Sequence, residues 1–190
     1  MKGSWILAAA IAAPILLAGA AHPTPVVKLV EHADAIRQSL SGAQRFFMRS
    51  VTIGQNDLAT IRKSVDYTPD NPDVQFYIGK SADGRDVGVV LFPQANTIHG
   101  PVEVALAMTP EGRIARVTVT RATVETKPWV EEAIASGFLD AMKGLSTTDN
   151  PASAVIPLKG KLGAMPYFEA EVIAAAVKRG LVVYGVLYKS

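Results

Sequence analysis

The chain has 190 residues, of which 49% are apolar, and its acidic and basic side chains nearly balance at a formal net charge of +2. This length and apolar content predict one domain with a substantial core and exclude a disordered chain. The balanced charge, without a basic run, gives no sign of nucleic-acid binding. The absence of cysteine excludes disulfides, thiolate metal sites, iron–sulfur clusters and a cysteine-linked lipid anchor.

The N-terminus predicts export. Residues 1–4 are a short basic start, residues 5–17 are apolar, and Ala18-Gly19-Ala20 fits a small-residue cleavage site. We therefore predict a signal peptide over residues 1–21 and a periplasmic or otherwise exported protein. An uncleaved membrane anchor is the alternative, because the apolar run is close to the shortest length that spans a bilayer. Residues 22–28 are predicted to be a linker, and residues 29–190 a single domain.

Two helices and a loop are predicted at the start of the domain. Apolar residues recur at helical spacing from Val26 to Phe47, which predicts a long amphipathic helix with a break near Gly42. A shorter helix begins at the cap Asn56-Asp57 and runs to Val65. Residues 67–73 contain two prolines and several Asp and Asn residues, which favour a loop.

The pattern then changes to strands. Residues 74–79 and 86–92 flank a turn at Asp83-Gly84, and residues 102–108 and 113–121 flank a turn with Pro110 and Gly112. These spacings predict two antiparallel hairpins.

Helices dominate the last third of the chain. One helix is predicted from Thr126 to Gly144, with Pro128 in its first turn, and a loop over 146–153 follows. The last helix is predicted to end at Gly180, and the apolar run 181–188 to form a closing strand. The order of elements predicts an α+β fold whose mostly antiparallel sheet is built from hairpins and packed with helices.

Three stretches in this order carry a resemblance to a known family. They are HGPVEVALAMTPEGRIARVTVTRATVET at 99–126, WVEEAIASGFLDAMKGLS at 129–146 and KLGAMPYFEAEVIAAAVKRGL at 161–181. Together they resemble the FMN-binding domain of the extracytoplasmic electron-transfer subunits of the sodium-pumping NADH:quinone reductase and the Rnf complex. The resemblance covers about residues 40 to 185 and implies an FMN-binding fold.

The resemblance also implies roles for particular residues. Glu125-Thr126 matches the family's Glu-Thr pair, and Gly163-Ala164-Met165 matches the end of a Ser/Thr-Gly-Ala-Thr motif before a helix. In many members the last threonine of that motif is esterified to the FMN phosphate. Its counterpart here is Met165, which has no hydroxyl, and Leu162 replaces the first motif residue. The family's glycine-rich segment after the Glu-Thr pair is also replaced, here by residues 127–129. We therefore expect no covalent FMN.

Non-covalent binding of FMN is still expected from the backbone. A helix start offers unpaired N–H groups and the positive end of the helix dipole, which together attract phosphate. Lys159 and Lys161 lie just upstream and add positive charge, whereas Pro166 removes one donor. The flat side chains of Trp129 and Tyr167 could stack on a flavin. The candidate cofactor-binding residues are Gly163, Ala164, Met165, Glu125, Thr126, Trp129, Tyr167 and Lys161.

Structural roles are the alternative for each candidate. Gly163-Ala164 can be a tight helix start, Trp129 a half-buried core residue and Glu125 a solvated acid at a strand end. Met165 can be a core residue that fills the space of a lost phosphate. The remaining residues have equally simple alternatives: Lys159 and Lys161 as loop charges, and His99 as a turn residue.

Two hypotheses of function follow. The first is an exported FMN-binding-domain-like protein in electron transfer, with FMN held non-covalently and with redox partners such as a cytochrome or a membrane reductase. The alternative is a flavin-free periplasmic binding or scaffold module that has lost its cofactor site. An enzyme with its own substrate is disfavoured, because the sequence contains no recognisable catalytic motif and no metal site. The partners predicted are proteins, not nucleic acid, with possible membrane association through the N-terminus.

Overall fold

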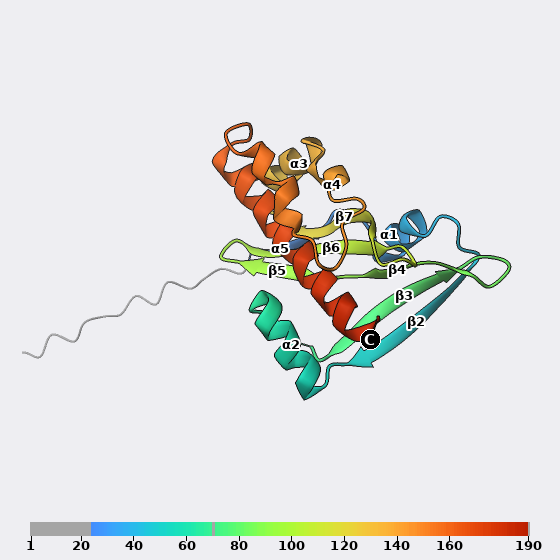
Figure 1. The fold of residues 1–190 in the computed structure, drawn as a ribbon. Coiled ribbons are helices and arrows are strands. Elements are labelled where there is room, and N and C mark those ends of the chain that lie inside the picture. The colour runs from blue at the N-terminus through green and yellow to red at the C-terminus, as the bar shows by residue number, and fades with distance from the viewer. Residues whose placement is uncertain (1–23, 70, 190) are drawn as a thin grey trace, which may run out of the picture.

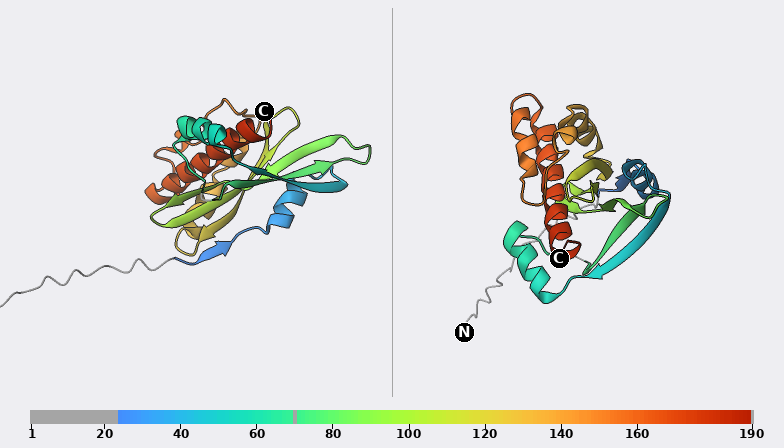
Figure 2. Two further views of the ribbon diagram at one scale, coloured as in Figure 1. Left: turned by 90° about the horizontal axis from the view of Figure 1, so that it is seen from below. Right: turned by 45° about the vertical axis from the view of Figure 1, so that its right-hand side comes forward.

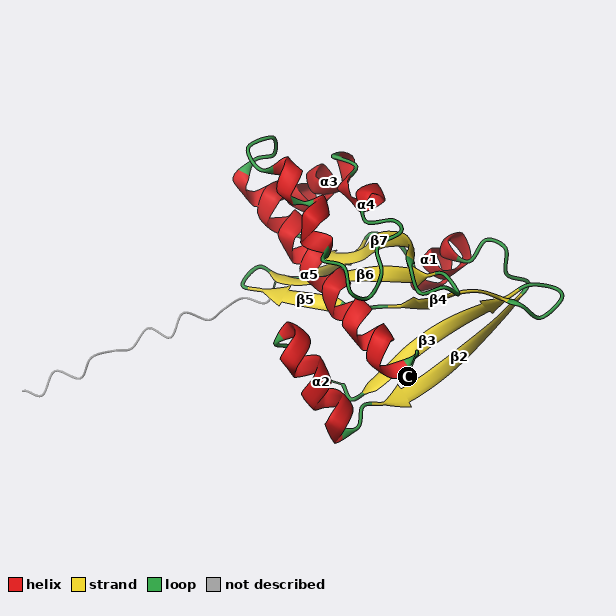
Figure 3. Cartoon of the chain, viewed as in Figure 1, coloured by secondary structure: helices red, strands yellow, loops and turns green. Residues whose placement is uncertain are grey.

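The computed structural model describes residues 24–69 and 71–189 (Figure 1). The predicted signal peptide or anchor, residues 1–21, lies outside the described residues. The described chain has the predicted α+β fold: one seven-stranded antiparallel sheet with packed helices (Figure 3). The strand order is β1-β7-β6-β4-β3-β2, and β5 pairs with β6 beside this path. The strands are β1 (Val26–Lys28), β2 (Arg45–Thr52), β3 (Asp73–Lys80), β4 (Asp86–Leu91), β5 (Gln94–Thr97), β6 (Gly100–Met108) and β7 (Ile114–Thr123).

Both predicted hairpins are confirmed. Strand β3 pairs with β4, and β6 pairs with β7, each in antiparallel register around the expected turn. The short helix predicted from the Asn56-Asp57 cap is also confirmed as α2 (Gln55–Val65), although Gly54 occupies its N-cap position. These elements carry strong local signals in turn residues and apolar spacing, which accounts for their correct prediction.

The long helix predicted from Val26 to Phe47 is wrong. This segment forms β1, the helix α1 (His32–Ser39) and β2. Strand β1 also takes in residues 26–28, which the sequence assigned to the linker, and pairs them with β7. The prediction failed because apolar residues of three separate elements together fit a helical spacing. In addition, β2 is an edge strand with little burial, so its sequence has no alternating apolar pattern.

The closing strand predicted over 181–188 is also wrong. The helix α5 (Ala164–Leu187) continues without a break through Gly180. Its last turns are apolar on nearly every side, because Leu181, Val182, Val183 and Tyr184 are all buried. A continuous apolar run of this length has the same appearance in a buried strand and in a buried helix.

The predicted helix after Thr126 is shorter than expected. It consists of α3 (Lys127–Ala135) and the single turn α4 (Phe138–Ala141). Gly137 separates them with φ of 79°, a left-handed conformation that glycine adopts without strain. The predicted loop 146–153 includes part of a short 3₁₀ turn, η1 (Pro151–Ala154), and a second turn, η2 (Ile156–Leu158), follows it.

The helices cover both faces of the sheet unequally. Figure 2 shows α5 and α2 on one side and α1 on the other. On the α5 side, the main core joins the helix residues Ile173 and Leu181 to Phe76, Leu91 and Leu106 of the sheet. On the α1 side, a small second core joins α1 to β4 and β6 through Ala35, Leu40, Val90, Ala105 and Ala107. The long helix α5 therefore contributes more residues to the main core than any other single element.

Two glycines of α5 test this packing. A Cβ atom at Gly180 would lie 2.6 Å from Cγ of Pro93 and 2.7 Å from Cδ2 of Leu106, whereas at Gly185 the nearest atom is Cγ2 of Thr147 at 3.4 Å. We expect Gly180→Ala to lower the free energy of unfolding by about 1–2 kcal/mol, since overpacking outweighs the gain in helix propensity. The matched variant Gly185→Ala should raise it by roughly 0.5–1 kcal/mol. Urea denaturation measures both, and equal effects of the two variants would contradict the close approach of α5 to the sheet.

Candidate functional site

The start of α5 has the backbone geometry of a helix N-terminus. Gly163 is the N-cap with φ of −60° and ψ of 162°. Its carbonyl oxygen accepts a hydrogen bond of 3.0 Å from the N–H of Tyr167, which closes the first turn. The N–H groups of Ala164 and Met165 point out of the helix end and have no helical partner. Gly163 and Ala164 are exposed and Met165 is half-buried, so a small anion has access to these donors.

The turn after β7 is held by two threonines. The hydroxyls of Thr123 and Thr126 lie 3.0 Å apart, and each residue's N–H donates to the other's hydroxyl oxygen at 3.2 Å. Thr123 also donates to the carbonyl oxygen of His99 at 3.0 Å. Thr126 is buried, and its hydroxyl is engaged inside this turn. The two threonines therefore fix Glu125 and the start of α3 against the turn between β5 and β6.

His99 joins four elements at this end of the sheet. Its Nδ1 lies 2.9 Å from Oε1 of Glu125. Its ring makes edge contacts with Trp129 at 5.5 Å and Phe168 at 6.4 Å between centroids. The β5–β6 turn, the β7–α3 turn, α3 and α5 thus meet around one imidazole. We call His99, Glu125, Trp129, Phe168 and the adjoining Glu169 the His99 cluster.

Glu169 is the member of the cluster that the sequence analysis missed. Its side chain is fully buried, and neither carboxylate oxygen has a hydrogen-bond partner among the described residues. Burial raises the pKa of Glu169; the nearby His99 lowers it and Glu125 raises it further. The sequence did contain a signal, since Glu169 falls on the apolar stripe of α5 beside Pro166, Ala170 and Ile173.

The predicted cofactor residues do not all lie in this cluster. Glu125 and Trp129 contact His99, and Thr126 fixes their turn. Tyr167 lines a different hollow, with Asn150, Ile156 and Lys178. Lys161 and Lys159 are exposed, and neither makes an ion pair with a described residue. The structure therefore brings the Glu-Thr pair and Trp129 to one group and leaves Tyr167 apart from it.

The fold defines an α+β domain with an antiparallel sheet. No protein-family model matches the chain, and no curated protein or solved structure matches it. Within residues 24–69 and 71–189, no helix is both long enough and apolar enough to cross a bilayer. The same residues contain no group of three or more His, Asp or Glu side chains arranged to hold a metal ion. The case for any function therefore depends on the side chains described above.

The buried acid predicts a pH dependence of stability. The pKa of Glu169 is raised in the folded state above its ordinary value of 4.5, so the folded protein binds more protons than the unfolded chain between these two values. Stability then falls as the pH rises from about 4.5 through the folded-state pKa. Glu169→Gln removes the titrating carboxyl group. The variant should therefore be as stable as the wild type in acid and more stable at neutral pH.

Denaturant unfolding across pH 4 to 8 measures this difference between wild type and variant. The exposed residue Glu132 of α3 provides the control, because Glu132→Gln removes a carboxylate without any burial. A stability difference for Glu169→Gln that stays constant over the pH range would show that the carboxyl group does not titrate as proposed.

Proposed function

We propose that this chain is an exported FMN-binding-domain-like electron carrier that holds FMN non-covalently between the start of α5 and the His99 cluster. The single observation that supports the proposal is the convergence of the three resembling stretches. His99 from the first stretch contacts Glu125 of the same stretch, Trp129 from the second and Phe168 from the third. Trp129 lies 30 residues after His99 and Phe168 lies 69 residues after it, yet both rings contact the same imidazole.

The residues at the start of α5 and in the His99 cluster suit non-covalent binding of the FMN phosphate and the flavin ring, but not a phosphoester bond at Met165. The outward N–H groups of Ala164 and Met165 suit a phosphate, and Lys159 and Lys161 add charge from the segment before the helix. Trp129 is half-buried and Phe168 is 36% exposed, so both offer aromatic surface. Met165 has no hydroxyl to form a phosphoester.

The chain's own groups would bind, orient and control protons, whereas a bound flavin would supply the redox chemistry. Glu169 is a buried acid whose raised pKa favours the protonated form, and the Glu125 carboxylate lies 2.9 Å from the ring of His99. Glu169 can therefore hold a proton close to the aromatic surface of the cluster. Ile98 and Val124, at 95% and 55% exposure, extend the apolar surface at this end. A redox partner such as a cytochrome or a membrane reductase would contact this surface.

A second candidate is the flavin-free binding or scaffold module. The observation in its favour is Met165, together with the ring contacts of His99, which occupy part of the aromatic surface of Trp129 and Phe168. In this case the exposed Ile98 and Val124 would contact a protein partner directly.

Flavin titration separates the two candidates. We expect FMN to bind with saturable quenching of its fluorescence and riboflavin, which lacks the phosphate, to bind much more weakly. Replacing both Lys159 and Lys161 by Gln should weaken the binding of FMN about fivefold, which is the effect expected of two exposed charges. The affinity for riboflavin should not change. Lys143→Gln, a change at another exposed lysine, is the control and should leave both affinities unchanged.

Absence of FMN binding at high micromolar concentration would overturn the electron-carrier proposal and favour the flavin-free module. Equal affinities for FMN and riboflavin would show that the start of α5 does not hold the phosphate.

A further inference from the structure

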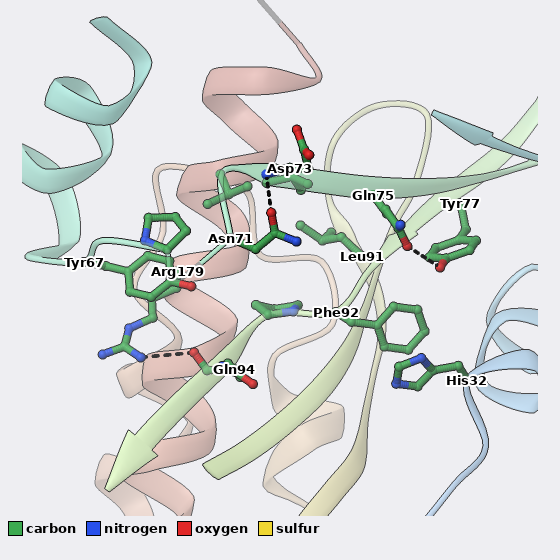
Figure 4. Close-up of a pocket in the computed structure, with 14 residues that line it drawn as sticks. His32, Tyr67, Asn71, Asp73, Gln75, Tyr77, Leu91, Phe92, Gln94 and Arg179 are labelled. Carbon is green, nitrogen blue, oxygen red and sulfur yellow. Dashed lines mark hydrogen bonds between the residues drawn. The ribbon is translucent and has the colours of Figure 1, made fainter. Parts of the chain in front are cut away.

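A gap in the sheet forms a second site, away from the His99 cluster. Strand β3 pairs with β4 only over Tyr77–Lys80, whereas its first half, Asp73–Phe76, pairs with β2 alone. Beyond the end of β4 the chain turns to pair with β6 as β5. A cavity of about 350 Å³ lies between the two diverging segments (Figure 4). This volume lies in the range of small-molecule sites.

Several parts of the chain line the cavity, which we call the sheet gap. The parts used below are α1, the loop before β3, β3, the β4–β5 connection and α5, through His32, Asn71, Gln75, Phe92 and Arg179 respectively; the end of β4 and the start of β5 also line the cavity, through Leu91 and Gln94. None of these residues belongs to the His99 cluster or to the start of α5. The inference that follows is therefore independent of the proposed function.

Arg179 gives the sheet gap a fixed positive charge. Its guanidinium donates to the carbonyl oxygen of Gln94 at 3.0 Å and lies 4.7 Å from the ring centroid of Tyr67. No described carboxylate lies within 4.0 Å of it. The carbonyl and the ring hold the group in place but do not neutralise it. A half-buried, oriented guanidinium that pairs with no described carboxylate is suited to bind an anion.

Two amides add hydrogen-bond donors. Oδ1 of Asn71 accepts from the N–H of Asp73 at 2.9 Å, and Oε1 of Gln75 accepts from the hydroxyl of Tyr77 at 2.8 Å. Both amide oxygens are thus engaged, so each side chain has its NH₂ group left to offer. The polar groups that remain for a ligand are mainly donors, which favours a ligand rich in acceptors.

The ring of Phe92 forms an ordered apolar wall. His32 stacks on it at 3.9 Å between centroids, and Tyr77 meets it edge-on at 5.6 Å. His32 is itself held by Oε1 of Glu103, 2.6 Å from its Nε2. These contacts fix the ring, and a flat ligand would pack against it at little cost in side-chain entropy.

We propose that the sheet gap binds a small organic monocarboxylate with a flat, ring-containing body. The carboxylate pairs with Arg179, and the ring packs beside Phe92. A single negative charge fits better than a phosphate dianion, because the lining carries one arginine to balance it. The Asp73 carboxylate is exposed and directed away from the centre of the site (Figure 4), so it does not cancel the charge of Arg179.

The test is an NMR titration of the full chain labelled with ¹⁵N, with three probes. Indole-3-carboxylate is flat and anionic, indole-3-carboxamide is its neutral counterpart, and cyclohexanecarboxylate is an anion without a flat ring. We expect saturable amide shifts around Phe92, Gln94 and Val183 with indole-3-carboxylate, and at least tenfold weaker binding of the other two.

Matched variants complete the test. Arg179→Gln should weaken the binding of indole-3-carboxylate about tenfold or more. Lys178→Gln is the control. It removes the same charge from the neighbouring residue, which lines a different hollow, and should leave the affinity unchanged. If Arg179→Gln does not fold, Gln75→Met at an exposed position removes one donor and should weaken the same probe severalfold. The proposal fails if indole-3-carboxylate gives no shifts at millimolar concentration, shifts a different surface, or binds no better than its carboxamide.

Discussion

The packing of α5 across the sheet is the constraint on which the rest of the structure depends. The helix is 24 residues long, and at Gly180 its backbone comes so close to Pro93 and Leu106 that a methyl group would not fit. This contact fixes the helix along the sheet, and the position of both ends follows from it. The N-terminal turns contribute Phe168 and Glu169 to the His99 cluster, and the later turns contribute Arg179 to the sheet gap. Glu169 and Arg179 are ten residues apart, about 15 Å along one rigid helix.

The same packing explains which elements the sequence could predict. The hairpins β3–β4 and β6–β7 are encoded by turn residues and alternation within a few residues, so their prediction needed no knowledge of distant contacts. The last turns of α5 differ, because their environment is apolar on almost every side. Burial all round removes the helical period, and the β-branched Val182 and Val183 then favoured a strand. Over residues 26–47, by contrast, a helical spacing was present without a continuous helix, because residues of β1, α1 and β2 matched that spacing by coincidence.

Some of the site residues could be chosen from the sequence, whereas others could be recognised only from the structure. Glu125 was a candidate because it belongs to the Glu-Thr pair, and Trp129 because its flat side chain could stack on a flavin. The structure brings both to His99. Glu169 and Arg179 have no motif, and their character comes from groups that are distant in sequence. Among the described residues, Glu169 is unusual because it is buried without a hydrogen-bond partner, and Arg179 because Tyr67 and Gln94 hold it while no carboxylate pairs with it. Long-range packing creates both properties. Spacing along the chain marks Glu169 only as an acid on the apolar stripe of α5, and it does not show what surrounds either residue.

Glu169 and Arg179 each reduce the stability that α5 gives to the fold. A buried carboxyl group without a partner loses its hydration, and an arginine held at a cavity wall loses side-chain entropy. Apolar residues at these positions would pack against the sheet without either penalty. Neither residue caps the helix, since they lie six and sixteen positions into α5 (Ala164 counted as the first). Within residues 24–69 and 71–189, neither forms an ion pair that would offset its cost. The binding roles proposed for Glu169 and Arg179 account for this cost, since Glu169 adjoins the His99 cluster and Arg179 lines the sheet gap. The helix that stabilises the fold thus also carries the two side chains on which binding is proposed to depend.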